Sequence, residues 1–319
     1  MIREKDQSKR GKQLKLSKGV HLVIDQSRFP LKQAVYFDTQ DGRMVFAIPR
    51  AGKAYVGTTD TFYDEDAVHP KMTNSDRAYI LNAINYMFPK ARVTEKDVES
   101  SWAGVRPLIF EEGKNPSEIS RKDEIWVSDS GLITIAGGKL TGYRKMAETL
   151  VDLLVNKLGQ AFRKCETRNL PISGGDVEGA QGFLAFLKKQ VAIGVELGLR
   201  EEEAYHLASM YGSNVPYLFQ IVKERSGDAG KYTIPVVLFS KLVYAIENEI
   251  AATPIDFFFR RTGDLLFHVD LVQEYKNQVT AFMADVFKWS QDERDQYSND
   301  VERELKNATA STVSKSKFD

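Results

Sequence analysis

Short apolar runs separated by polar turns dominate the first 135 residues of the chain. Such runs, bounded by glycine, proline and aspartate, are typical of β-strands. They predict strands at residues 19–25, 34–38, 43–49, 53–57 and 98–103. The second and third strands flank Gln40-Asp41-Gly42, and an Asp-Gly pair between apolar runs favours a hairpin. The pattern therefore predicts an antiparallel meander.

One stretch of this half has helical spacing instead, over residues 74–88. Thr73 and Asp76 stand at the spacing of a capping box, and Pro89 is a stop signal. The helix is predicted to bury the face formed by Ile80, Ala83, Ile84 and Met87.

The pattern changes after residue 160. Leu170 to Asp176 is rich in glycine and proline and reads as a linker, with Asp176 as the N-cap of the following helix. Apolar residues then recur with a period near 3.6, which predicts helices at 177–194, 201–210, 214–225, 234–250 and 267–305. We place a domain boundary between about residues 160 and 175.

A glycine-rich turn joins these two regions. The apolar run Gly131–Ile135 leads into Ala136-Gly137-Gly138-Lys139-Leu140-Thr141 and then into an amphipathic helix that Gly159 ends. Its apolar stripe consists of Leu140, Tyr143, Ala147, Leu150, Leu154 and Leu158. A helix start presents unpaired N–H groups, which suit a phosphate or the carbonyl edge of a flavin. The same pattern fits an ordinary strand-helix turn, but Lys139 opposes the helix dipole and so indicates an anion.

The composition narrows the classes of protein. The 44 basic and 44 acidic side chains cancel, so the chain lacks the strong positive charge of nucleic-acid binders. Its single cysteine, Cys165, excludes a disulfide framework and a cysteine metal cluster. His69, His206 and His268 lack ligand-like spacing, so no metal site is predicted.

Three polar residues are candidates for chemistry. His21 lies inside a predicted strand and is either a half-buried structural histidine or a general base. Arg106, in Gly104-Val105-Arg106-Pro107, pairs with a carboxylate or offers its guanidinium to a ligand. Arg121 is a loop residue that is either a solvated charge or a ligand-binding cation.

The order of these motifs resembles a known family. Lys18-Gly19-Val20-His21, Gly57-Thr58-Thr59-Asp60, Gly104-Val105-Arg106-Pro107-Leu108, Ile119-Ser120-Arg121 and Gly137-Gly138-Lys139-Leu140-Thr141 follow one another. This series, together with Pro254 to Phe267, resembles aerobic FAD-dependent glycerol-3-phosphate dehydrogenases and the related α-glycerophosphate oxidases. The resemblance extends from about Gly11 to Glu304.

The resemblance implies an α+β fold with a mixed, largely antiparallel sheet. Its expected parts are a β-rich substrate-binding domain at 1–130, a returning strand and helix of the FAD-binding domain at 131–165, an all-helical domain at 166–306 and a disordered tail at 307–319. The family begins with a Gly-x-Gly-x-x-Gly unit that this sequence lacks. We therefore expect a C-terminal fragment with absent or weak FAD binding and little turnover.

The same resemblance implies residue roles in oxidising sn-glycerol 3-phosphate to dihydroxyacetone phosphate by hydride transfer to FAD. His21 is the expected catalytic base, and Arg106 is expected to stabilise the developing oxygen charge. Arg121 and Lys139 are the expected substrate-binding cations. The backbone of Gly137, Gly138, Leu140 and Thr141 is expected to meet the flavin.

The electron acceptor is predicted to be quinone, with oxygen as the alternative. Some oxidases carry a long insertion where this chain has only Leu108 to Ile119, which favours the dehydrogenase. A cytoplasmic protein is expected, with peripheral association at the inner face of the cell membrane and a homo-oligomer left open. Another flavin oxidase and a non-enzymatic interaction module remain as alternatives, and no nucleic-acid partner is expected.

Overall fold

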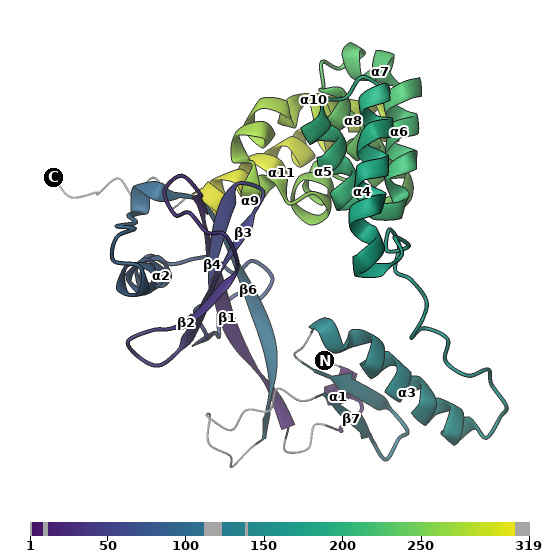
Figure 1. The fold of residues 1–319 in the computed structure, drawn as a ribbon. Helices are drawn as coiled ribbons and strands as arrows, with labels where there is room; N and C mark the ends of the chain where they lie inside the picture. The colour runs from purple at the N-terminus through teal and green to yellow at the C-terminus, as the bar shows by residue number, and fades with distance from the viewer. Residues whose placement is uncertain (1, 9–11, 112–122, 138–139, 310–319) are drawn as a thin grey trace. The chain divides into compact units, whose positions relative to one another are not determined.

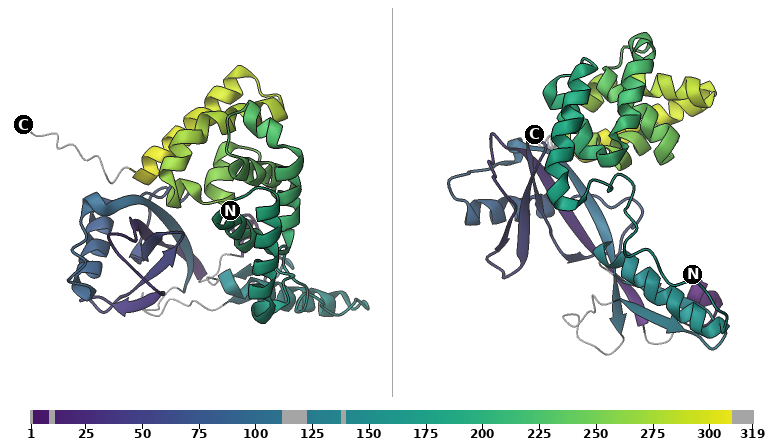
Figure 2. Two further views of the ribbon diagram at one scale, coloured as in Figure 1. Left: turned by 45° about the horizontal axis from the view of Figure 1, so that its top comes forward. Right: turned by 45° about the vertical axis from the view of Figure 1, so that its right-hand side comes forward.

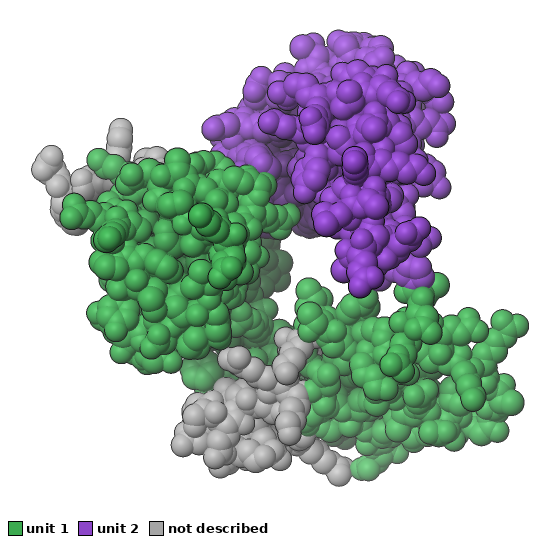
Figure 3. All heavy atoms as spheres, viewed as in Figure 1, with its two compact units in different colours: residues 1–170 green, residues 171–319 purple. Residues whose placement is uncertain are grey.

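The computed structural model describes residues 2–8, 12–111, 123–137 and 140–309. The chain divides into two compact units, Met1–Leu170 and Pro171–Asp319 (Figure 3). The first unit combines a β-sheet with helices, and the second is helical throughout its described part. The predicted α+β class, with a largely antiparallel sheet and a helical C-terminal region, is confirmed.

Six strands of the first unit form one sheet (Figure 1). They are β1 (Lys12–Asp25), β2 (Val35–Asp38), β3 (Met44–Arg50), β4 (Lys53–Gly57), β5 (Thr61–Phe62) and β6 (Val98–Glu111). The order is β2-β3-β4-β1-β5, with β6 on the other side of β1. Every pairing is antiparallel, as the alternating sequence pattern predicts.

The two long strands differ from the sequence prediction. β1 and β6 pair with each other from Lys12↔Glu111 to Ile24↔Val98, so each has 14 residues. The segment Gly104–Pro107, expected to follow a strand, therefore lies inside β6. Among the described strands β6 pairs with β1 alone, and an edge position tolerates the missing N–H of Pro107.

Helix α2 (Asn74–Met87) covers one face of the sheet (Figure 1 and Figure 2). The core of this unit includes side chains of both the helix and the sheet, and the predicted capping box of Thr73 and Asp76 begins the helix. Met87, expected on the buried face, is 37% exposed. The side chains buried between helix and sheet include Val20, Leu22, Ile24, Val45, Val56, Ile80 and Ile84.

The predicted strand-turn-helix near residue 135 forms differently. Strands β7 (Glu124–Val127) and β8 (Ile133–Ala136) make an antiparallel hairpin. A 3₁₀ turn at Leu140–Gly142 follows, so helix α3 (Tyr143–Leu158) begins later than the apolar pattern indicates. Gly159 ends α3 in the left-handed conformation, as predicted. Its apolar stripe lies on the surface, because α3 has no buried residue.

The second unit contains successive helices joined by short turns. They are α4 (Gly179–Glu196), α5 (Glu201–Tyr211), α6 (Val215–Glu224), α7 (Ser226–Lys231), α8 (Val236–Glu249), a π-helix (Asp256–Arg261), α9 (Asp264–Phe267), α10 (Val269–Phe287) and α11 (Gln291–Thr309). Glu178, not Asp176, occupies the N-cap position of α4. No described helix is long and apolar enough to cross a bilayer.

The single helix expected over 267–305 is wrong. Lys288 adopts the left-handed conformation and ends α10. Ser290 and Glu293 then cap each other, since the Ser290 N–H donates to the Glu293 carboxylate at 2.8 Å and the Glu293 N–H to Ser290 Oγ at 3.3 Å. The reciprocal bonds satisfy donors that the break would leave unpaired. Helix α11 includes residues 307–309, which corrects the start of the expected disordered tail; residues 310–319 lie outside the described ranges.

An ion pair lies inside the helical unit. The Lys241 ammonium lies 3.1 Å from the Asp264 carboxylate, and both side chains are more than nine-tenths buried. His268 Nδ1 lies 2.9 Å from the other oxygen of Asp264. Burial raises the pKa of Asp264, but the hydrogen bond from His268 and the charge of Lys241 outweigh burial, so that pKa lies well below its usual value.

Candidate active site

The face of the sheet opposite α2 carries His21. Val20, Leu22 and Ile24 of β1 point into the core, so the alternation of a strand places Gly19 and His21 on the other face. In the register of the sheet, His21 lies between Gly57 of β4 and Trp102 of β6.

Aromatic side chains surround the His21 imidazole. It stacks on Trp102, with ring centroids 4.6 Å apart and ring planes 10° apart. Phe46 and Tyr55 lie at 5.4 and 6.4 Å. Burial, and to a smaller extent the charge of Arg106, lowers the pKa of His21 to about 4. The imidazole is therefore neutral at physiological pH.

Gly57 leaves the space in which this ring lies. A Cβ atom at Gly57 would come within 2.3 Å of His21 Cδ2 and 2.8 Å of the Val20 carbonyl oxygen. Gly57→Ala is therefore expected to destabilise the unit by about 1–3 kcal/mol, because the ring has to move. Urea denaturation measures this cost. Gly104→Ala is the matched control, since a Cβ there meets nothing within 4 Å; equal stability of the two variants would contradict the prediction.

Arg106 reaches across β1 from the neighbouring strand β6. Its Nη1 donates to Asp60 Oδ1 at 2.5 Å, and Asp60 lies on the far side of β1, between β4 and β5. Gly19 lies beneath this bridge: a Cβ at Gly19 would be 2.4 Å from Thr58 Oγ1 and 3.5 Å from Arg106 Nη2. The absence of a side chain at Gly19 lets the guanidinium lie close to the sheet.

Two polar atoms on this face are buried without a partner. Among the described residues, neither His21 Nδ1 nor Thr58 Oγ1 has a hydrogen-bond partner. Buried polar groups in native proteins are paired in the large majority of cases. Together with a neutral imidazole and a guanidinium, these atoms form a surface suited to a polar ligand that bears a hydroxyl or an anionic oxygen.

The other predicted site residues are described only in part by the structure. Arg121, Gly138 and Lys139 lie outside the described residues. Leu140 is 88% exposed and Thr141 is exposed too. A Cβ at Gly137 would be 2.1 Å from the Asp123 carboxylate, so Asp123 lies against the glycine turn where the sequence predicts an electron-rich ligand.

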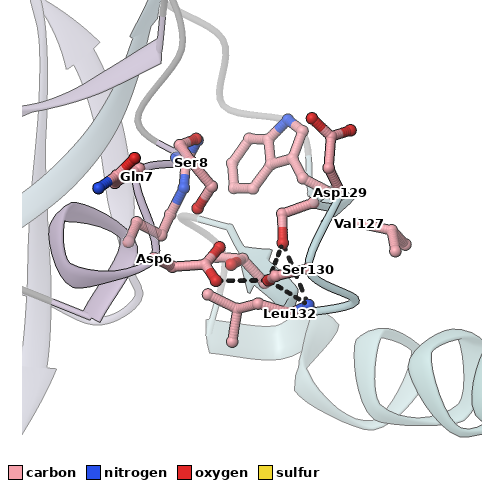
Figure 4. A pocket seen from close by; sticks show the side chains of 11 residues that line it. Asp6, Gln7, Ser8, Val127, Asp129, Ser130 and Leu132 are labelled. Carbon is pink, nitrogen blue, oxygen red and sulfur yellow. Dashed lines mark hydrogen bonds between the residues drawn. The ribbon is translucent and has the colours of Figure 1, made fainter.

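A separate pocket contains none of the predicted site residues (Figure 4). It has a volume of about 470 Å³ and lies between the segment of helix α1 (Ile2–Lys5) and the β7–β8 hairpin. Ser130 donates to Asp6 there, and the Leu132 N–H donates to Ser128 at 3.1 Å. The Ser130–Asp6 bond joins the two segments, and the Leu132–Ser128 bond closes the turn of the hairpin.

The sequence reasoning did not identify Asp60 as the partner of Arg106, and it did not identify Trp102. The only signal was the polar run Thr58-Thr59-Asp60 directly after a strand. A partner 46 residues away and across an intervening strand has no local sequence signature. In the described part of the chain, no three His, Cys, Asp or Glu side chains are arranged to hold a metal ion.

Comparison with protein families gives two matches. Residues 2–144 match the family described as FAD dependent oxidoreductase. Residues 165–294 match the family described as the C-terminal domain of alpha-glycerophosphate oxidase. Together the two matches cover most of the chain and both regions of the fold.

Individual proteins are similar to this chain over nearly its whole length. The aerobic glycerol-3-phosphate dehydrogenase of Bacillus subtilis (strain 168) is 55% identical over 311 residues, 96% of this chain and 56% of the relative. That of Staphylococcus haemolyticus (strain JCSC1435) is 51% identical over 313 residues, 97% of this chain and 56% of the relative. The chain thus spans little more than half the length of these relatives.

A solved structure is similar as well. The glycerol-3-phosphate dehydrogenase of Bacillus halodurans, crystallised with FAD, superposes with a TM-score of 0.89 at 52% identity. The match covers 99% of this chain and 61% of that protein. The chain is thus similar, over nearly its whole length, to part of the FAD-dependent aerobic glycerol-3-phosphate dehydrogenases.

Proposed function

We propose that this chain provides the substrate-binding part of an enzyme that oxidises sn-glycerol 3-phosphate to dihydroxyacetone phosphate. The observation that carries the proposal is the pair of His21 and Arg106 on one face of the sheet, with a neutral imidazole next to a fixed cation. Such a pair can accept a hydroxyl proton and stabilise the negative charge that develops on the same oxygen.

In this proposal His21 is the general base. Its pKa of about 4 leaves the imidazole unprotonated, and therefore able to accept the C2 hydroxyl proton, throughout the neutral range. Stacking on Trp102 fixes the plane of the ring. Arg106 stabilises the C2 oxygen, and its charge opposes protonation of His21 before the substrate binds.

FAD is the cofactor of the proposed reaction, and when bound it accepts the hydride from C2. Leu140 and Thr141 are exposed at the start of the turn that precedes α3, which fits backbone contact with the pyrimidine edge of a flavin. Gly137 and Gly138 complete this proposed contact. The nearby Asp123 carboxylate disfavours a dianionic phosphate at Gly137 more strongly than the uncharged edge of an oxidised flavin.

The substrate phosphate needs cations other than Arg106, which is engaged by Asp60. We assign it to Arg121 and Lys139, on the resemblance of the Ile119-Ser120-Arg121 and Gly137-Gly138-Lys139 segments to the family. A dianionic phosphate is held best by such charge-assisted donors.

Quinone is the electron acceptor we propose, because the named relatives are dehydrogenases. A cytoplasmic enzyme that binds the inner face of the membrane peripherally would reach such an acceptor. Oxygen is the second candidate, since residues 165–294 match the C-terminal domain of an oxidase. Hydrogen peroxide formation distinguishes oxygen from quinone as the acceptor.

Flavin spectroscopy tests the proposal. The purified chain is mixed with FAD and desalted, and retained absorbance at about 450 nm reports bound oxidised flavin. Anaerobic sn-glycerol 3-phosphate is then expected to bleach that band, whereas glycerol and sn-glycerol 1-phosphate are not. Retained flavin that glycerol 3-phosphate fails to bleach would contradict the proposed substrate. Weak retention is the expected result, because the sequence lacks the Gly-x-Gly-x-x-Gly unit, so the reduction step is measured with FAD kept in excess.

A further inference from the structure

We infer that Asp60 is a positioning residue, which fixes the guanidinium of Arg106 above Gly19 and thereby sets where the substrate oxygen is held. The assignment of this oxygen to glycerol 3-phosphate rests on the proposed function. The geometry of the bridge between Arg106 and Asp60 does not, because the bridge involves only the protein's own side chains.

The ion pair between Arg106 and Asp60 spans strand β1. Arg106 belongs to β6 and Asp60 to the segment between β4 and β5, and these flank β1 on opposite sides. The side chain of Arg106 therefore crosses a whole strand to reach the carboxylate at 2.5 Å. The Arg106 side chain is 40% exposed, so it has room to extend into water. It instead lies across the sheet and pairs with Asp60.

A bulge brings Asp60 to this position. The register passes from His21↔Gly57 to Lys18↔Thr61, so β1 advances three residues while its partner advances four. One extra residue thus lies in the segment 58–60. Such bulges redirect side chains and are frequent next to active sites.

Hydrogen bonds hold the bulge in place. Thr59 Oγ1 donates to the Lys18 carbonyl at 3.4 Å, and Ser17 Oγ donates to Asp60 Oδ1 at 3.4 Å. The Lys18 ammonium in turn forms a buried ion pair with Asp76, 2.7 Å away at the start of α2. The Asp60 carboxylate is therefore connected through β1 to the buried ion pair at the start of α2.

The bridge also shapes the surface beneath it. Nη1 of Arg106 bonds Asp60, while Nη2 lies close to Gly19. The buried Thr58 hydroxyl, which has no partner among the described residues, lies close to the same glycine. The guanidinium edge and the Thr58 hydroxyl thus face the same bare glycine. This arrangement suits an oxygen that accepts from both.

The competing interpretation is an ordinary surface ion pair. Arg106 and Asp60 are 40% and 36% exposed, and pairs of this kind contribute only about 0–1 kcal/mol to stability. A stability measurement therefore cannot separate the two interpretations. The position of the Arg106 charge has to be measured.

His21 is the reporter for that position, because the charge of Arg106 contributes to its low pKa. The His21 pKa is measured by NMR titration of its imidazole resonances in the folded chain. If Asp60 fixes Arg106, Asp60→Asn releases the guanidinium, and the His21 pKa is then about 0.5 unit higher than the loss of the carboxylate charge alone would make it. Asp60→Asn in the Arg106→Gln background measures that direct loss, which lowers the pKa, whereas Arg106→Gln alone raises it.

Asp38→Asn, an exposed acid of β2 on the same sheet, is the matched control and leaves the pKa unchanged. The inference is overturned if Asp60→Asn shifts the His21 pKa equally in the wild type and in the Arg106→Gln background. It is also overturned if Arg106→Gln has no effect, because Arg106 would then not be located near His21. Amide NMR spectra of each variant confirm that the sheet remains folded.

Kinetics of the FAD-loaded protein provide a second test. Asp60→Asn is expected to lower kcat about tenfold with little change in KM, a part of the loss that follows removal of one donor to a charged oxygen. Asp60→Glu, which keeps the carboxylate, is expected to recover most of kcat. A change confined to KM would overturn the inference. A wild type that binds FAD but shows no turnover contradicts the proposed function, while the NMR result still decides the role of Asp60.

Discussion

Replacing His21 by glutamine is expected to lower kcat/KM for sn-glycerol 3-phosphate by about 10²–10⁴-fold in the FAD-loaded protein, the usual effect of losing a general base. Glutamine has a similar polar surface but cannot accept the proton. The rate constant of anaerobic flavin reduction by substrate measures the loss at the chemical step. The wild-type rate is expected to fall as the pH drops through about 4, since protonation of His21 occurs there and removes the base.

His69→Gln is the control for this substitution. His69 lies in the same unit, is 65% exposed and pairs with Asp66 at its own surface. It should therefore retain wild-type activity. A His21→Gln variant with activity within about threefold of wild type would exclude His21 as the base.

Replacing Asp264 by asparagine is expected to lower the free energy of unfolding by about 3–5 kcal/mol, because the Lys241 ammonium is left buried without its counter-charge. Urea denaturation followed by far-UV circular dichroism measures the change. Asp300→Asn is the control, since Asp300 pairs with Arg303 at the surface of α11, and it should cost at most about 1 kcal/mol. Replacing both partners, as Lys241→Met with Asp264→Leu, is expected to restore most of the stability; a double variant as unstable as the single one would contradict this explanation.

The same carboxylate predicts a pH dependence. The pKa of Asp264 is lowered in the folded protein, so its stabilising contribution is present above the unfolded value of about 3.9 and is lost as the pH falls below it. The wild type should therefore lose stability below about pH 4 more steeply than the variant that lacks both charges.

Local signals in the sequence identified the elements whose ends are set by neighbouring residues. The capping box of Thr73 and Asp76 begins α2 as predicted, and Gly159 ends α3. The Ser290–Glu293 box was equally local, but the continuous helical period on both sides concealed it. Caps depend on residues three positions apart and can be read directly from a sequence.

The extent of the long strands could not be read in this way. β1 continues back to Lys12 because β6 pairs with it along its whole length, and a strand partner about 90 positions away leaves no periodic trace in the charged segment that it orders. The apolar stripe of α3 correctly predicted a helix, and α3 has no buried residue in the described structure.

The sequence by itself determined the class of fold, the resemblance to a family and the candidates His21 and Arg106, because motif order and hydrophobic period are properties of neighbouring residues. Only the tertiary structure decided that His21 is neutral against Trp102, that Arg106 crosses Gly19 to reach Asp60, and that Asp264 is buried with Lys241. These features depend on which strands and helices are adjacent in space. Burial, pKa and ion pairing are consequences of that packing, which no local pattern contains.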